Sequence, residues 1–156
     1  MQTPLVRVHL VRPPLDAAAR QGRFGPVRPC PDHDGLRGPD HGAWTGRTLE
    51  EVAAQDPEGL HAWLTDPAHV PPGGESVAAL IDRVGAELAG LPAGTHRLVV
   101  EQAVVRAAVV HALELPAAAF WRLDVRPGSV TTLTGRSGRW NLLVGRPEEE
   151  PTDDRA

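Results

Sequence analysis

The chain has 156 residues, of which 41% are hydrophobic and 23% are charged. This balance is typical of a single soluble globular domain and excludes a wholly disordered chain. The formal net charge of −4 argues against a general nucleic-acid-binding protein, which would carry a basic face. No run of about 18 apolar residues occurs, so the sequence predicts no membrane-spanning helix.

Scarce residue types exclude further kinds of chemistry. The sequence contains no lysine, so neither a Schiff base nor a lysine general base is available. Cys30 is the only cysteine, which excludes an intrachain disulfide and a cysteine metal cluster and makes a reducing, cytoplasmic location the default expectation. No spacing of the HExxH or CxxC type occurs, so we predict neither a metal site nor a cofactor.

The first half of the chain indicates one strand, several short helices and a long loop. Residues 5–11 alternate apolar side chains with Arg7 and His9, which predicts a short strand that Pro13 ends. Residues 25–46 are rich in proline and glycine and lack a periodic apolar face, and long loops of this kind are often functional. Helical patterns occupy residues 16–21, 48–55, 57–64 and 76–89.

The second half alternates strand patterns with helical patterns. A strand is predicted at residues 97–100, a buried helix at 103–113, a short helical piece at 116–121, a hairpin formed by 123–125 with 130–133, and a last strand at 139–144. This alternation predicts an α/β fold, a three-layer sandwich with a mostly parallel sheet. We expect one domain over residues 1–146, followed by an acidic, disordered tail over residues 147–156.

Three segments, taken together in their order and spacing, resemble the histidine phosphatase superfamily. The first reads GAWTGRTL at residues 42–49, the second reads GGES at 73–76 and is followed by Arg83 and Val84, and the third runs from residue 98 to 142. The similarity implies a phosphoglycerate-mutase-like fold, here in a trimmed form because much of the region between the first strand and Leu36 is missing. It also implies phosphoryl transfer or hydrolysis as the family's chemistry.

The positions that carry this chemistry in the family differ in the present chain. The resemblance places the phosphorylated histidine directly after Arg12, where this sequence has Pro13, and a second histidine at Glu101. It places the general acid at Gly38. Proline cannot form a phosphohistidine, and Glu101 puts an anion where the family has a cation, so we expect a bound phosphate to be repelled.

Five residues are therefore our candidates for the site. Glu101 and His41 are the predicted proton-transfer groups, because a carboxylate beside apolar strands and a histidine near the pocket mouth both suit acid–base work. Arg12, Glu75 and Gln102 are predicted to bind the substrate, since the carboxyl edge of the sheet is where α/β proteins place their ligands.

Each assignment has a structural alternative. Glu101 could form a salt bridge to Arg12 or Arg106, and Arg12 could instead pair with Asp40. Glu75 could simply favour the positive end of the helix that follows it. His41 could be a loop histidine bonded to backbone, and the four tryptophans are expected in the core and not as a stacking platform.

We therefore favour a divergent member that has lost phosphatase chemistry and performs acid–base catalysis on a small metabolite, with natural-product biosynthesis as the suggested context. The alternatives are a catalytically inactive binding or scaffold protein and, last, a residual phosphatase that uses His41 or His9 as its nucleophile. The expected partner is a small-molecule ligand. A homodimer is also expected, because a shortened sheet leaves strand edges unpaired.

Overall fold

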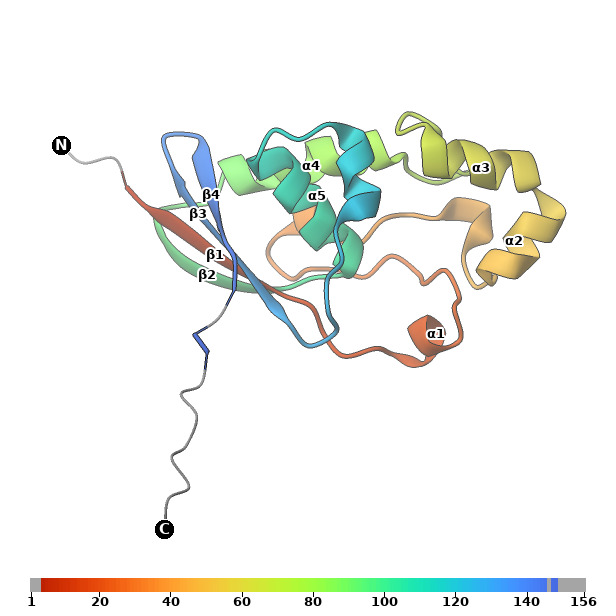
Figure 1. Ribbon diagram of the computed structural model, residues 1–156, viewed down its shortest axis with the longest axis horizontal. Coiled ribbons are helices and arrows are strands. Elements are labelled where there is room, and N and C mark those ends of the chain that lie inside the picture. Colours follow the sequence, from red (N-terminus) through yellow and green to blue (C-terminus); the bar gives the residue numbers. More distant parts are fainter. Residues whose placement is uncertain (1–3, 146, 149–156) are drawn as a thin grey trace, which may run out of the picture.

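The computed structural model describes residues 4–145 and 147–148. It has an α/β fold in which one four-stranded sheet packs against helices, with a lobe of shorter helices beside it (Figure 1). Most of the predicted tail, residues 149–156, lies outside the described residues. No helix in the described part of the chain is long and apolar enough to cross a membrane.

The elements follow the predicted order closely. The strands are β1 (Val6–Val11), β2 (Gly94–Val99), β3 (Val130–Arg136) and β4 (Arg139–Leu143). The α-helices are α1 (Ala17–Arg20), α2 (Leu49–Gln55), α3 (Pro57–Thr65), α4 (Val77–Ala89) and α5 (Gln102–Ala112). Three 3-10 helices complete the fold: η1 (Asp34–Leu36), η2 (Gly42–Trp44) and η3 (Ala117–Arg122).

Side-chain caps explain where the helices begin. The Thr48 hydroxyl accepts a hydrogen bond from the Glu51 amide at 3.1 Å, and Ser76 accepts one from Ala79 at 3.0 Å. Asp56 caps α3 in the same way, and Pro57 then occupies the first turn, where its missing N–H costs nothing.

The sheet is mixed, which corrects the predicted mostly parallel sheet. Its strand order is β2-β1-β3-β4. Only β1 and β2 run parallel, while β3 is antiparallel to both β1 and β4. The physical reason is that the described chain contains one helical crossover, between β1 and β2, whereas β3 and β4 are joined by a tight turn.

That tight turn also corrects the predicted hairpin. Residues 123–125 form no strand, and β3 pairs instead with β4. Ser137 and Gly138 both have positive φ, 54° and 77°, as a two-residue hairpin turn requires.

One face of the sheet is covered and the other is open, so the fold has two layers and not the predicted three. Val8 and Leu10 of β1 are fully buried beneath the helices. On the opposite face Val99 is 48% exposed, Val130 56% and Leu143 65%. Figure 1 shows α4 and α5 on one side of the sheet and no helix of the described residues on the other.

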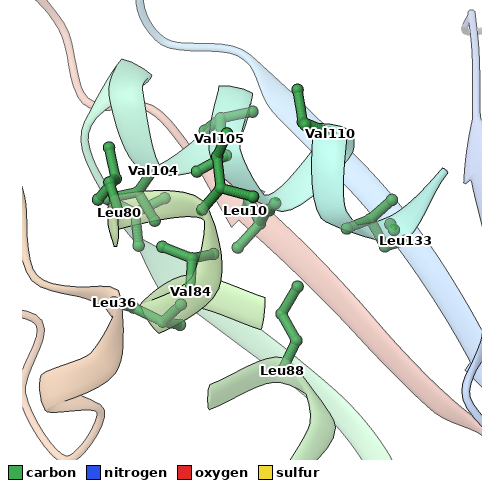
Figure 2. Close-up of a cluster of buried hydrophobic side chains, with 14 of the residues drawn as sticks. Leu10, Leu36, Leu80, Val84, Leu88, Val104, Val105, Val110 and Leu133 are labelled. Atoms are coloured by element: carbon green, nitrogen blue, oxygen red, sulfur yellow. The ribbon is translucent and has the colours of Figure 1, made fainter. Parts of the chain in front are cut away.

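The core lies between the covered sheet face and helices α4 and α5. Figure 2 shows Val84 and Leu88 of α4 packed with Val104 of α5, Leu10 of β1 and Leu133 of β3. A second, smaller cluster of buried side chains, Trp44, Val52 and Leu60, holds α2 and α3 together.

Candidate active site

A cavity of about 160 Å³ lies at the carboxyl ends of β1 and β2. These two parallel strands end opposite each other, with Val11 paired to Val99, so the residues that follow both strands meet at one edge of the sheet. The cavity walls include all of the predicted site residues except Glu75: Arg12, His41, Glu101 and Gln102.

Arg12 carries a charge that the described part of the chain does not neutralise. Its Nη1 donates to the Val125 carbonyl oxygen, and no described carboxylate lies within ion-pair distance of it. The predicted alternative, a salt bridge to Glu101 or Asp40, is therefore wrong. Burial of the guanidinium lowers the pKa of Arg12.

Glu101 precedes α5, and its carboxylate is paired with an arginine that sequence reasoning missed. Its Oε1 lies 3.4 Å from Nε of Arg28, and Arg28 also forms an ion pair with Asp16. Burial raises the pKa of Glu101, and the charge of Arg28 opposes that rise. Arg28 lies in the proline-rich loop, where no periodic pattern indicates the direction of a side chain.

The Glu101 carboxylate fills the space above Gly38. A Cβ atom at position 38 would lie 2.2 Å from Oε2 of Glu101, closer than any real contact. The side chain of Glu101 thus occupies the volume that a side chain at position 38 would need. Position 38 is where the resemblance places an acid, so a carboxylate reaches that volume from a different element.

A second cavity, of about 220 Å³, adjoins the first and is walled by aromatic rings. His41 packs edge-on against Phe24 with ring centres 5.0 Å apart, and Trp63 packs against Trp121 at 4.6 Å. Trp44 is buried as predicted, but Trp63 and Trp121 are only partly buried and line this cavity, so the sequence underestimated their exposure. Burial lowers the pKa of His41, and the charges of Asp40 and Glu75 oppose that shift.

Glu75 lines the aromatic cavity, yet its carboxylate is engaged in an ion pair. Its oxygens lie 2.9 Å and 2.7 Å from Nε and Nη2 of Arg83. Arg83 in turn donates to the carbonyl oxygens of Gly35 and Arg37, each at 2.9 Å. Glu75 therefore fixes the loop beside the cavity, while the adjacent Ser76 caps α4.

Arg106 and Gln102 project from the first turns of α5. Gln102 lines both cavities. Nε of Arg106 donates to the Leu123 carbonyl oxygen at 2.6 Å, and its guanidinium lies over the Phe120 and Trp121 rings. Burial lowers the pKa of Arg106, as does repulsion from Arg12, while Asp124 raises it.

The remaining candidates lie away from these cavities. His9 faces the open side of the sheet and bonds to Thr132 at 2.8 Å, and Cys30 is buried in the core. Among the described residues, no group of three or more histidine, cysteine or acidic side chains is arranged to hold a metal ion.

The model of the histidine phosphatase superfamily (branch 1) matches residues 16–145. The chain belongs to that superfamily. The confirmed α/β fold is phosphoglycerate-mutase-like, as the three sequence segments predicted.

Solved phosphatase structures share this fold at low sequence identity. The alpha-ribazole phosphatase from Shigella flexneri superposes with a TM-score of 0.73 at 18% identity, over 88% of this chain and 95% of that chain. A phosphoserine phosphatase mutant from Entamoeba histolytica, in complex with phosphoserine, superposes with a TM-score of 0.74 at 16% identity, over 89% and 95% of the two chains. At these identities the similarity shows the fold alone.

Curated relatives match over shorter segments. Phosphoserine phosphatase 1 from Hydrogenobacter thermophilus is 44% identical over 46 residues, 29% of this chain and 22% of the relative. A bifunctional protein from Mycobacterium tuberculosis is 47% identical over 51 residues, 33% of this chain and 14% of the relative. The matches thus span less than a quarter of the length of these relatives.

Proposed function

We propose that this histidine phosphatase superfamily member has lost phosphohistidine chemistry and catalyses proton transfer on a small metabolite. Two residues support the loss. Pro13 lines the cavity at the position that the resemblance assigns to the nucleophile, and it has no side chain that could accept a phosphoryl group. Glu101 stands at the position of the second histidine and supplies a negative charge.

The placement of Glu101 is the observation that carries the proposal. Its carboxylate is partly buried, has a raised pKa and lies in the volume above Gly38. A carboxylate in this state can accept a proton from one substrate atom and return the same proton to another. Such an isomerisation balances without any co-reactant.

Other residues of the cleft support this reaction. Arg12 would orient an anionic substrate group, because its charge has no carboxylate partner in the described chain. His41 would remain neutral near pH 7, since burial lowers its pKa, and a neutral imidazole can either give or take a proton. Gln102 would donate a hydrogen bond to the substrate. Glu75 would hold the loop beside the aromatic cavity in place through its ion pair with Arg83.

Electrostatics argue against a phosphate substrate at this site. Two unit charges about 4 Å apart interact by about 4 kcal/mol near a protein surface. A phosphate dianion beside Glu101 would incur this repulsion for each of its charges, and Arg28 is already shared between Glu101 and Asp16.

The test is proton exchange in D₂O, followed by NMR at the carbon next to the carbonyl of pyruvate and phenylpyruvate. We expect the wild type to exchange at least one of them above the buffer rate and Glu101→Gln to lose about a hundredfold or more of that rate. Gly38→Ala should also lose activity, because the new methyl group would displace the carboxylate. Glu58→Gln, an exposed change on α3, is the matched control and should retain full activity.

Two outcomes would overturn this proposal. One is hydrolysis of p-nitrophenyl phosphate by the wild type that survives Glu101→Gln, which would establish a residual phosphatase. The other is an absence of exchange with both oxo acids, which would favour the second candidate, a binding protein without turnover. That candidate is supported by the ion-pair chain from Asp16 through Arg28 to Glu101, which holds the carboxylate in place.

A further inference from the structure

The charged cavity and the aromatic cavity are two compartments of one cleft. Six residues line both of them: Arg23, Gly25, Pro39, His41, Gln102 and Ala103. A ligand that fits this cleft therefore meets a charged wall at one end and ring surfaces at the other. The chemistry of the two walls specifies the chemistry of the ligand.

The charged compartment contains one arginine side chain, Arg12, that has no carboxylate partner among the described residues. Its lining includes Arg12, Arg23 and Arg28 with two carboxylates, Asp16 and Glu101, and Arg23 pairs with a carboxylate outside this lining, Glu51. Arg28 is shared by both carboxylates, whereas Arg12 is bonded only to a carbonyl group among the described residues. An anionic group placed beside Arg12 would neutralise a charge that the fold leaves uncompensated.

The anion should carry a single charge. Glu101 faces the same compartment, so each additional negative charge on the ligand adds repulsion. A carboxylate has one charge and a planar fork that matches a guanidinium, while a phosphate monoester approaches two charges near pH 7. Arg12 and Glu101 both line the cavity of about 160 Å³, and this combination of an unpaired cation with a nearby anion favours a carboxylate ligand.

The aromatic compartment should receive a flat ring. Trp63 and Trp121 are partly exposed and meet at an interplanar angle of 77°, and Phe24 meets Trp63 at 69°. Such edge-to-face contacts fix the rings and leave parts of their surfaces facing the cavity, where another planar group can pack. The guanidinium of Arg106 lies over Phe120 and Trp121 and holds these rings on one side of the cavity.

We infer that the cleft selects a planar, ring-bearing monocarboxylate, with the carboxylate at Arg12 and the ring packed against the exposed surfaces of Trp63 and Trp121. Calling this ligand a substrate rests on the proposed function, but its binding does not. The inference narrows the metabolite to one chemical class and excludes phosphate esters as the preferred ligands.

Calorimetric titration with three matched probes tests the inference. The probes are 2-naphthoate, its neutral isostere 2-naphthalenemethanol, and 2-naphthyl phosphate. We expect 2-naphthoate to bind about tenfold more tightly than either of the others. Equal binding of the neutral alcohol, or tighter binding of the phosphate, would overturn the inference.

Variants test which residues of the cleft contact the carboxylate and which contact the ring of the ligand. Arg12→Gln should weaken 2-naphthoate about tenfold and leave the neutral alcohol unchanged, while Trp121→Leu should weaken both. Glu101→Gln should strengthen 2-naphthyl phosphate about tenfold, because it removes the repelling charge. Arg97→Gln on the open sheet face and Trp140→Leu on β4 are the controls, and both should bind 2-naphthoate like the wild type.

The binding and exchange experiments can refute the ligand class and the proposed function independently. Selective binding of 2-naphthoate without any proton exchange would refute the proposed function and leave the ligand class standing. Glu101-dependent exchange of pyruvate without a preference for 2-naphthoate would refute the ligand class and leave the proposed function standing.

Discussion

At the scale of single residues, the site contains two titratable groups whose pKa values burial shifts in opposite directions. Burial lowers the pKa of His41 below its ordinary 6.5 and raises the pKa of Glu101 above its ordinary 4.5. Both shifts favour the uncharged form, because the cleft gives less solvation than water. The neutral imidazole therefore stabilises the fold above pH 6.5, whereas the protonated carboxyl does so below 4.5 and loses that effect as the pH rises through its folded pKa.

The His41 shift predicts a pH dependence of stability. The unfolded chain takes up a proton near pH 6.5 and the folded chain does so only at lower pH, so the free energy of unfolding should fall as the pH drops from about 7.5 to about 5.5. His41→Gln should reduce this fall, as measured by urea unfolding at several pH values. His61→Gln, an exposed change on α3, should keep the wild-type slope. An unchanged slope in His41→Gln would contradict the assignment.

At the scale of elements, the cleft depends on how one helix holds one loop. Arg83 of α4 connects Glu75 to the backbone of η1 and the residue after it, so a single side chain fixes the segment that carries Gly38. The side chains of Arg83 and Glu75 are only 14% and 17% exposed, so their ion pair is largely removed from water. Position 38 can accommodate Glu101 only while this segment stays in place.

Removal of one member of this pair should be costly. Glu75→Gln leaves the Arg83 charge without its partner, and breaking such a buried pair costs about 3 kcal/mol. The free energy of unfolding from urea titration should therefore decrease by about this amount. Asp34→Asn provides the contrast, because Asp34 pairs with Arg37 while 92% exposed and should cost almost nothing. Equal effects of the two changes would contradict the role given to Glu75.

The same elements show what the sequence could and could not reveal. Capping residues such as Thr48 and Ser76 form hydrogen bonds with nearby backbone and can be recognised in the sequence. The predicted starts of these helices therefore agree with the observed ones. The partner of Glu101 is Arg28, 73 residues away in a loop without periodicity, and no local signal indicates such a contact. The prediction of a mostly parallel sheet was wrong for the same reason. The antiparallel pairing of β1 with β3 joins segments that are distant in the sequence, and no local pattern indicates it.

At the scale of the whole molecule, the open sheet face is the largest departure from the predicted layers. Val99, Val130 and Leu143 lie exposed at one end of it, and Arg7 and Arg97 lie exposed on the same face. Exposed apolar groups of this kind on a sheet often mark a surface that another chain covers. We propose this face as the contact surface of the predicted homodimer.

Light scattering tests that placement. We expect the mass of a dimer for the wild type and a shift toward the monomer for Val130→Arg, because the substitution adds a charge to an apolar surface. Val70→Arg, at a site 51% exposed in a loop, is the matched control and should keep the wild-type mass. A monomer at millimolar wild-type concentration would refute the prediction.

The central position of β1 has a consequence for synthesis on the ribosome. This strand precedes every other element of the described fold, yet its hydrogen-bonding partners are β2, which begins at Gly94, and β3, which ends at Arg136. During translation β1 must therefore wait until the long segment up to β2 has been made before either of its edges is paired. Its apolar residues Val8 and Leu10 stay accessible throughout that interval, so nascent chains that stall before β2 emerges should be the species most dependent on chaperones.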